Sequence, residues 1–136
     1  MGEARVVLHF GEDYSNSNPI YQSEQERPNY YGASSTYLNM LTATNDPRKA
    51  VYFNGSVGSA PGEANSAASK IGTNYQSASS PVYLVSYVEI KFIEAEAQFQ
   101  TGEKEKAAVA YNEALKASLL REGVDEDGTW YASNTE

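Results

Sequence analysis

The apolar residues of the second half of the chain recur at helical spacing on both sides of a glycine. The stretch from Ser86 to Ser118 reads SYVEIKFIEAEAQFQTGEKEKAAVAYNEALKAS. This pattern predicts two amphipathic helices joined by a tight turn at Thr101–Gly102. A helix that is apolar on two faces is expected to lie between neighbours. The first helix has two such stripes, Val85, Val88, Phe92, Ala95 and Phe99 on one face and Ile90 and Ala97 nearly opposite.

The second helix has a single apolar stripe, which predicts one buried face. Thr101 is expected to cap this helix and Gly123 to end it. Much of the tetratricopeptide helix–turn–helix pattern is present, with small residues at Ala95, Gly102, Ala107 and Ala114 and an aromatic at Tyr111. Because one such unit cannot bury both of its faces, we expect another element to cover the first helix. The stripe consists of Ala107, Ala108, Tyr111, Ala114, Leu115 and Ser118.

The N-terminal part of the chain alternates short apolar runs with polar segments. The run Arg5–Phe10 is compatible with a strand or with the end of a helix, because six residues cannot distinguish the two. Residues 13–39 are rich in Asn, Ser, Gln, Glu and Tyr, and Pro19 and Pro28 favour extended or turn geometry before them. We expect an ordered irregular segment here, followed by a short helix over Ser35–Leu41.

The middle of the chain is rich in turn-forming residues. Asn45–Arg48 predicts a turn or a helix start, and Val51–Phe53 predicts a short strand that enters a turn at Asn54–Gly55. Residues 56–80 are rich in Gly, Ala, Ser and Asn, which predicts a long functional or mobile loop. The tail after Gly123 is acidic, and we expect that the domain is interrupted within it.

Composition and charge exclude several classes of function. The chain has 136 residues, which predicts one domain, and its net charge of −8 argues against binding to nucleic acid or to anionic lipid. It contains no cysteine, which excludes disulfides and thiolate metal sites, and no apolar run reaches the length of a membrane span. The eleven tyrosines, together with abundant Asn, Ser and Gly, are typical of surfaces that bind polar ligands.

The sequence contains no catalytic constellation. Its one histidine, His9, lies in an apolar run, which favours a packed structural role over a catalytic one. The segment Asp125–Gly128 hints at a calcium loop, but two essential carboxylates are absent from the required positions, so a solvated acidic turn is the better interpretation. Glu89 and Glu96 share a helix face, where hydrogen bonding is favoured over acid–base chemistry. We therefore expect no catalytic residue, no metal and no cofactor.

The candidate ligand-binding residues are aromatic. A flat aromatic ring suits the C–H face of a pyranose, so these residues are candidates for stacking against sugar rings. Each tyrosine is equally compatible with an anchoring role in its loop, and both interpretations stay open. The candidates are Tyr30, Tyr31, Tyr52, Tyr75, Tyr83 and Trp130.

A series of short motifs, in order and at matching spacing over about residues 18–120, resembles the latter half of the SusD/RagB-like outer-membrane nutrient-binding lipoproteins. Each motif is weak alone, but the ordered series is specific. The motifs are Asn18–Gln22, Arg27–Tyr30, Tyr37–Leu38, Asn45–Arg48, Val51–Phe53, Ser86–Glu89, Phe92–Ile93, Ala95–Ala97, Gly102 and Ala107–Ser118.

The resemblance implies a mainly α fold of tetratricopeptide-like hairpins with long loops, to which the sequence adds one short β-hairpin. We expect one partial domain over 1–136, with a loop-rich ligand-side segment (18–85) and a helical hairpin (86–122). The implied function is non-enzymatic capture of oligosaccharides or other nutrients at the cell surface, with a SusC-like TonB-dependent outer-membrane transporter as partner. We expect a fragment or shortened relative, attached to the membrane only through a lipid anchor that this chain lacks. The alternative is a tetratricopeptide-type protein-interaction module without a small-molecule ligand.

Overall fold

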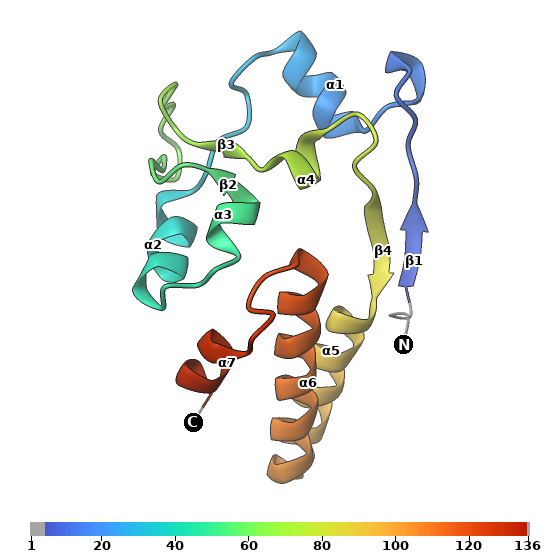
Figure 1. Cartoon of the computed structure of the whole chain (residues 1–136), viewed down its shortest axis with the longest axis vertical. Helices are drawn as coiled ribbons and strands as arrows, with labels where there is room; N and C mark the ends of the chain where they lie inside the picture. The colour runs from blue at the N-terminus through green and yellow to red at the C-terminus, as the bar shows by residue number, and fades with distance from the viewer. Residues whose placement is uncertain (1–4, 136) are drawn as a thin grey trace. The chain divides into compact units, whose positions relative to one another are not determined.

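The computed structural model describes residues 5–135, which fold mainly as helices (Figure 1). Two short strand pairs accompany the helices, so the predicted class, mainly α with a short β-hairpin, is confirmed. The helices are α1 (Pro19–Glu26), α2 (Ser35–Ala43), α3 (Lys49–Tyr52), α4 (Thr73–Gln76), α5 (Tyr87–Gln100), α6 (Lys104–Glu122) and α7 (Thr129–Asn134), and Tyr14–Asn16 form a 3₁₀ turn. The strands are β1 (Arg5–Leu8), β2 (Phe53–Asn54), β3 (Lys70–Ile71) and β4 (Val82–Ser86).

The described residues form two compact units. Residues 9–82 make one unit, which we call the loop unit, and residues 5–8 with 83–135 make the other, which we call the hairpin unit. In the hairpin unit, β1 pairs with β4, and the two strands run in opposite directions (Figure 1). The first four residues of the run Arg5–Phe10 therefore form a strand, and His9, which follows the strand, is exposed rather than packed as predicted.

The helical hairpin forms as predicted, although one cap differs. The Ser86 hydroxyl caps α5 by accepting a hydrogen bond from the Glu89 amide at 3.2 Å. The Thr101 hydroxyl was predicted to cap the second helix, but it donates to the Ala97 and Gln98 carbonyls at 3.2 and 3.0 Å, at the end of α5. Gly123 ends α6 as predicted, because its φ of +67° is readily adopted by a residue without a Cβ atom.

The seam between α5 and α6 is made of small residues. Ala114 is fully buried and Ala110 nearly so, which allows the two backbones to approach closely. Ala108 and Tyr111, which were predicted to be buried, are exposed, whereas Ala110 and Leu119 are buried. The other four predicted residues, Ala107, Ala114, Leu115 and Ser118, are buried, so the predicted face of α6 is largely confirmed, with the tyrosine at its edge.

Residues 125–128 form the predicted turn, in which Glu126 and Asp127 are exposed. The helix α7, which was not predicted, follows this turn, and the Asp125 carboxylate holds its first backbone amides, with hydrogen bonds from the Trp130 and Tyr131 amides of 2.8 and 2.9 Å. A carboxylate at the N-terminus of a helix also interacts favourably with the helix dipole. Asp125, one of the three acidic residues that suggested a calcium loop, therefore has a capping role.

The loop unit begins with a helix that the sequence analysis missed. Residues 13–39 were predicted to be irregular, but Asn18 caps α1 by accepting from the Ile20 amide at 2.8 Å, and Pro19 occupies the first helical position. The Asn18 side chain is only 1% exposed, and its Nδ2 donates to the Ser80 carbonyl at 2.8 Å. Its backbone amide donates to Ala78, also at 2.8 Å. One asparagine therefore joins α1 to a segment about sixty residues away.

The central segment of the loop unit is more regular than predicted. The helix α2 is confirmed, and the Asp46 carboxylate accepts from the Arg48 amide at 2.9 Å in the predicted turn. The predicted strand Val51–Phe53 is wrong for its first two residues, which lie in α3. The predicted long loop contains β3, which pairs antiparallel with β2, and α4. Gly72 lies so close to α3 that a Cβ atom on it would be only 1.8 Å from the Val51 carbonyl oxygen.

We expect Asn18→Asp to destabilise the loop unit by about 2 kcal/mol or more. The new carboxylate still accepts from the Ile20 amide, but it replaces a buried donor with a negative charge facing the Ser80 carbonyl. Urea denaturation followed by far-UV circular dichroism measures the change. The control is Asn39→Asp on the exposed side of α2, for which we expect a change within about 0.5 kcal/mol. Equal stability of the two variants would contradict the assigned role of Asn18.

Candidate ligand-binding site

A hollow of about 720 Å³ lies between two segments of the loop unit, residues 28–34 and 59–68. Main-chain hydrogen bonds fix its walls: the Ala33 amide donates to Ser69, and the Ser59 amide donates to Ala33, both at 2.8 Å. The Ser35 amide then donates to the Ser59 carbonyl at 2.9 Å. The hollow is therefore lined by loops whose backbones are hydrogen-bonded to each other, within the volume range of known small-molecule sites.

Two adjacent tyrosines line this hollow. The ring centroids of Tyr30 and Tyr31 lie 5.1 Å apart in an edge-to-face arrangement. Tyr30 is 60% exposed, and the Arg27 guanidinium lies 5.7 Å from its ring centroid. Tyr31 is half-buried. The pair thus consists of one supporting ring and one ring that is open to a ligand.

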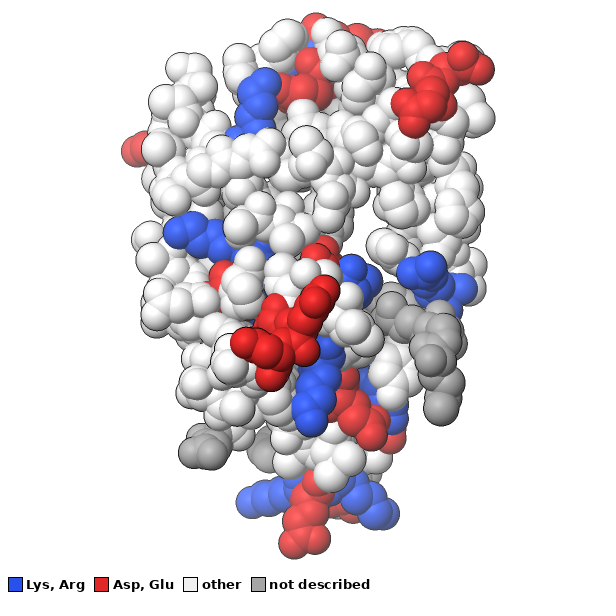
Figure 2. All heavy atoms as spheres, viewed as in Figure 1, with Lys and Arg blue, Asp and Glu red and all other residues white. Residues whose placement is uncertain are grey.

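The polar groups around the tyrosines are mostly uncharged. Asn65 is held by its own loop, with its amide nitrogen donating to Gly58 at 3.2 Å and its oxygen accepting from the Ala67 amide at 3.0 Å. The other polar lining residues are Asn29, Ser34, Ser59, Ser66 and Glu63, whose carboxylate is exposed. In the view of Figure 2, acidic and basic side chains are scattered over wide uncharged areas. This lining suits a ligand that is rich in hydroxyl groups.

A buried carboxylate supports the turn before Tyr30. Glu24, in the last turn of α1, is 7% exposed, and its Oε1 accepts from the Asn29 amide at 2.7 Å and from Lys70 Nζ at 2.9 Å. Burial acts to raise the pKa of Glu24, but the Lys70 ammonium and the backbone amides of Asn29 and Tyr31 outweigh it and lower the pKa below its ordinary value. At neutral pH, Glu24 is therefore ionised and accepts hydrogen bonds from the turn and from Lys70.

The other predicted aromatic residues lie elsewhere. Tyr52 and Tyr75 are in the loop unit, with ring centroids 5.8 Å apart. Tyr37, which the prediction omitted, stacks on Tyr52 at 6.2 Å and meets the Phe53 ring at 5.8 Å. These rings form a second aromatic cluster. Tyr37 could have been identified as a candidate because it is exposed on α2, whereas Leu38 and Leu41 of the same helix are buried.

Tyr83 and Trp130 belong to the hairpin unit. The Tyr83 ring has the Arg5 and Arg121 guanidinium groups 5.7 and 5.5 Å from its centroid. Trp130 lies in α7 and is half-buried. Of the six predicted residues, the structure therefore brings together Tyr30 with Tyr31 and Tyr52 with Tyr75.

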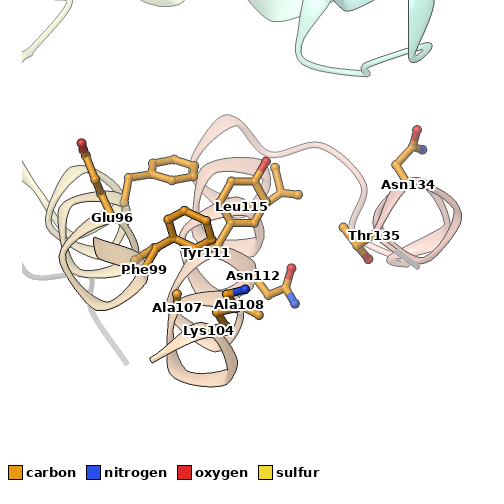
Figure 3. A pocket seen from close by; sticks show the side chains of 12 residues that line it. Glu96, Phe99, Lys104, Ala107, Ala108, Tyr111, Asn112, Leu115, Asn134 and Thr135 are labelled. Carbon is orange, nitrogen blue, oxygen red and sulfur yellow. The ribbon is translucent and has the colours of Figure 1, made fainter. Parts of the chain in front are cut away.

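The hairpin unit has an apolar groove of about 600 Å³ between α5, α6 and the end of α7. Figure 3 shows Phe99 and Tyr111 beside each other on the hairpin, with Asn134 at the end of α7 and Thr135 directly after it across from them. The Phe92 and Tyr111 ring centroids are 5.5 Å apart. Phe99 is 60% and Tyr111 51% exposed, so the apolar face of α5 that was expected to be covered is open here.

Fold and site define a class: a mainly helical protein whose loops carry a hollow lined by aromatic, polar and small apolar side chains. Residues 2–134 match the SusD-like family model described as "Starch-binding associating with outer membrane". The chain belongs to this family, which is one of binding proteins, and the resemblance found in the sequence is confirmed. No curated protein matches the chain.

Two further observations concern the described residues, 5–135. None of their helices combines the length and apolar character that crossing a membrane requires. Within the same residues, no group of three or more His, Asp or Glu side chains is placed to hold a metal ion.

We expect acid to remove the contribution of Glu24 to stability. Because its pKa is lower in the folded than in the unfolded chain, this contribution is present above the ordinary value of 4.5 and is lost as pH falls through the folded pKa. Urea denaturation of the wild-type chain and of Glu24→Gln between pH 7 and 3 should show a gap in unfolding free energy that narrows toward pH 3. A gap that is constant with pH would contradict this assignment.

Proposed function

We propose that the hollow of the loop unit binds an oligosaccharide of the starch class and that no reaction follows. The observation that carries this proposal is the exposed Tyr30 ring, supported by Tyr31, at a hollow whose lining combines amide and hydroxyl groups with alanine and proline side chains. An aromatic face packs against the C–H groups of a sugar ring, while amide and hydroxyl groups bond to its hydroxyls. The family description, starch binding, agrees with this chemistry.

The carboxylates near the hollow support binding rather than hydrolysis. Most glycoside hydrolases use two carboxyl groups, one on each side of the scissile bond. Among the residues that line the hollow, Glu63 is the only carboxylate. Glu24 is buried behind the tyrosines' turn, where its Oε1 accepts hydrogen bonds from Asn29 and Lys70.

We expect Tyr30→Ala to weaken glycan binding at least tenfold, which corresponds to about 1.4 kcal/mol. Isothermal titration calorimetry of the full chain with maltoheptaose measures this, with xylo- and manno-oligosaccharides as comparisons. The matched control is Tyr111→Ala, which removes a tyrosine of similar exposure from the hairpin groove and should leave glycan affinity unchanged. A folded wild-type chain that binds none of these glycans would contradict the proposed function.

We infer that the protein acts at the cell surface as a lipid-anchored component, together with a SusC-like TonB-dependent transporter. Membership of the SusD-like family, described as associating with the outer membrane, supports this inference. Affinity purification of the tagged chain from detergent-solubilised outer membranes of its source should recover a TonB-dependent transporter identified by mass spectrometry. Recovery of the chain without any such transporter would contradict the partnership.

A protein-interaction module remains the second candidate, because the groove with Phe92, Phe99 and Tyr111 exposes apolar rings on a helical hairpin. Exposed aromatic rings of this kind often anchor protein interfaces. The two functions are separated by the pair of variants above. A protein-interaction module would bind no glycan, and its Tyr111→Ala variant would no longer bind the protein partner. A glycan binder would instead lose glycan affinity in Tyr30→Ala.

A further inference from the structure

We propose that Glu24 is a positioning residue for glycan binding. Its carboxylate fixes the backbone of the turn at residues 28–31 and so presents the Tyr30 ring to the ligand. The proposal rests on the proposed function of the hollow and assigns a role to a residue that does not itself line the hollow.

The turn contains a residue in the left-handed region, a conformation that an external hydrogen bond helps to hold. Asn29 has a φ of +66°, which asparagine adopts more readily than other residues with a Cβ atom but less readily than glycine. Tyr30 follows directly, and because its ring is largely exposed, packing alone cannot fix its place. The carboxylate accepts from the Asn29 amide at 2.7 Å, at the residue where the chain takes the costly conformation.

Glu24 is itself held rigidly. It lies in α1, whose start is fixed by the buried Asn18, and its Oε1 also accepts from Lys70 of β3 at 2.9 Å. Its second oxygen, Oε2, is buried and has no hydrogen-bond partner within the described residues. A buried charge of this kind persists only where its partners keep a fixed geometry.

The segment that carries the tyrosines is held at both ends. Glu24 binds its start at Asn29, and the Ser69 carbonyl accepts from its end at the Ala33 amide. Between these points Gly32 passes so close to Ala68 that a Cβ atom would lie 2.9 Å from the Ala68 side chain. Lys70 and Ser69 are neighbours in sequence, so one short segment supports both ends. This arrangement preorganises the ring and lowers the ordering cost of binding.

The test is Glu24→Gln in the full chain, titrated calorimetrically with maltoheptaose or with the oligosaccharide that the wild type binds. Glutamine keeps the size of the side chain but removes the charge that Asn29 and Lys70 contact. We expect about a tenfold loss of affinity, together with faster hydrogen exchange at the Asn29 and Tyr31 amides. The matched control is Glu26→Gln, the same change on an exposed residue of α1, which should leave affinity unchanged.

A double-mutant comparison separates positioning from general damage to the fold. If Glu24 acts through Tyr30, Glu24→Gln causes no further loss of affinity in a Tyr30→Ala background, whereas a merely destabilised protein loses affinity in both backgrounds. If Glu24→Gln does not fold, Lys70→Gln, at a half-exposed side chain, replaces it and should show a smaller loss with the same dependence on Tyr30.

The outcomes distinguish the two proposals. A wild-type chain that binds no glycan overturns the proposed function and the role of Glu24 with it. A wild-type chain that binds, with a folded Glu24→Gln variant of equal affinity, overturns the role of Glu24 alone. A loss of the same size in both backgrounds also overturns it.

Discussion

The loop unit depends on a buried asparagine. Asn18 satisfies a free amide at the start of α1 and, through its own side-chain and backbone amides, two carbonyls of the segment before β4. Because an unpaired buried polar group costs free energy, these hydrogen bonds are expected to form and break together. With it, α1 has a fixed start, and Glu24 at the other end of the helix has a fixed place. The tyrosine-bearing turn is therefore supported from a residue that lies outside the hollow.

Local signals in the sequence predicted the elements with local causes. The α5–α6 turn, the end of α6 at Gly123 and the helix α2 all follow from spacing and terminal residues that lie within the element itself. The helix α1 was missed although Asn18 and Pro19 form a standard start signal, because its polar residues conceal any apolar stripe. The buried face of α6 was predicted correctly at four of six residues, but a stripe chosen by hydrophobicity includes Tyr111, whereas close helix contact favours alanine.

The candidate site was predictable in part for the same reason. Tyr30 and Tyr31 stand out in sequence as adjacent aromatics in a polar segment, but nothing local shows which ring is exposed. Glu24 could not be identified, since its partner Lys70 is 46 residues away and its other contact is to backbone. The pairing of Tyr52 with Tyr75 likewise depends on how β3 and α4 fold, and both of these elements lie in the segment that was predicted to be a long loop.

The two units solve the problem of small size in different ways. The hairpin unit uses alanines at its seam, which gives close helix contact but leaves rings such as Phe99 and Tyr111 exposed at its edge. The loop unit has few buried large apolar side chains and relies on hydrogen bonds and one ion pair between distant segments. Hydrogen bonds of this kind determine which conformation the loops adopt, but each adds little net stability because it replaces a hydrogen bond to water. A ligand surface benefits from that property, since a loop fixed before binding loses less entropy when the ligand arrives.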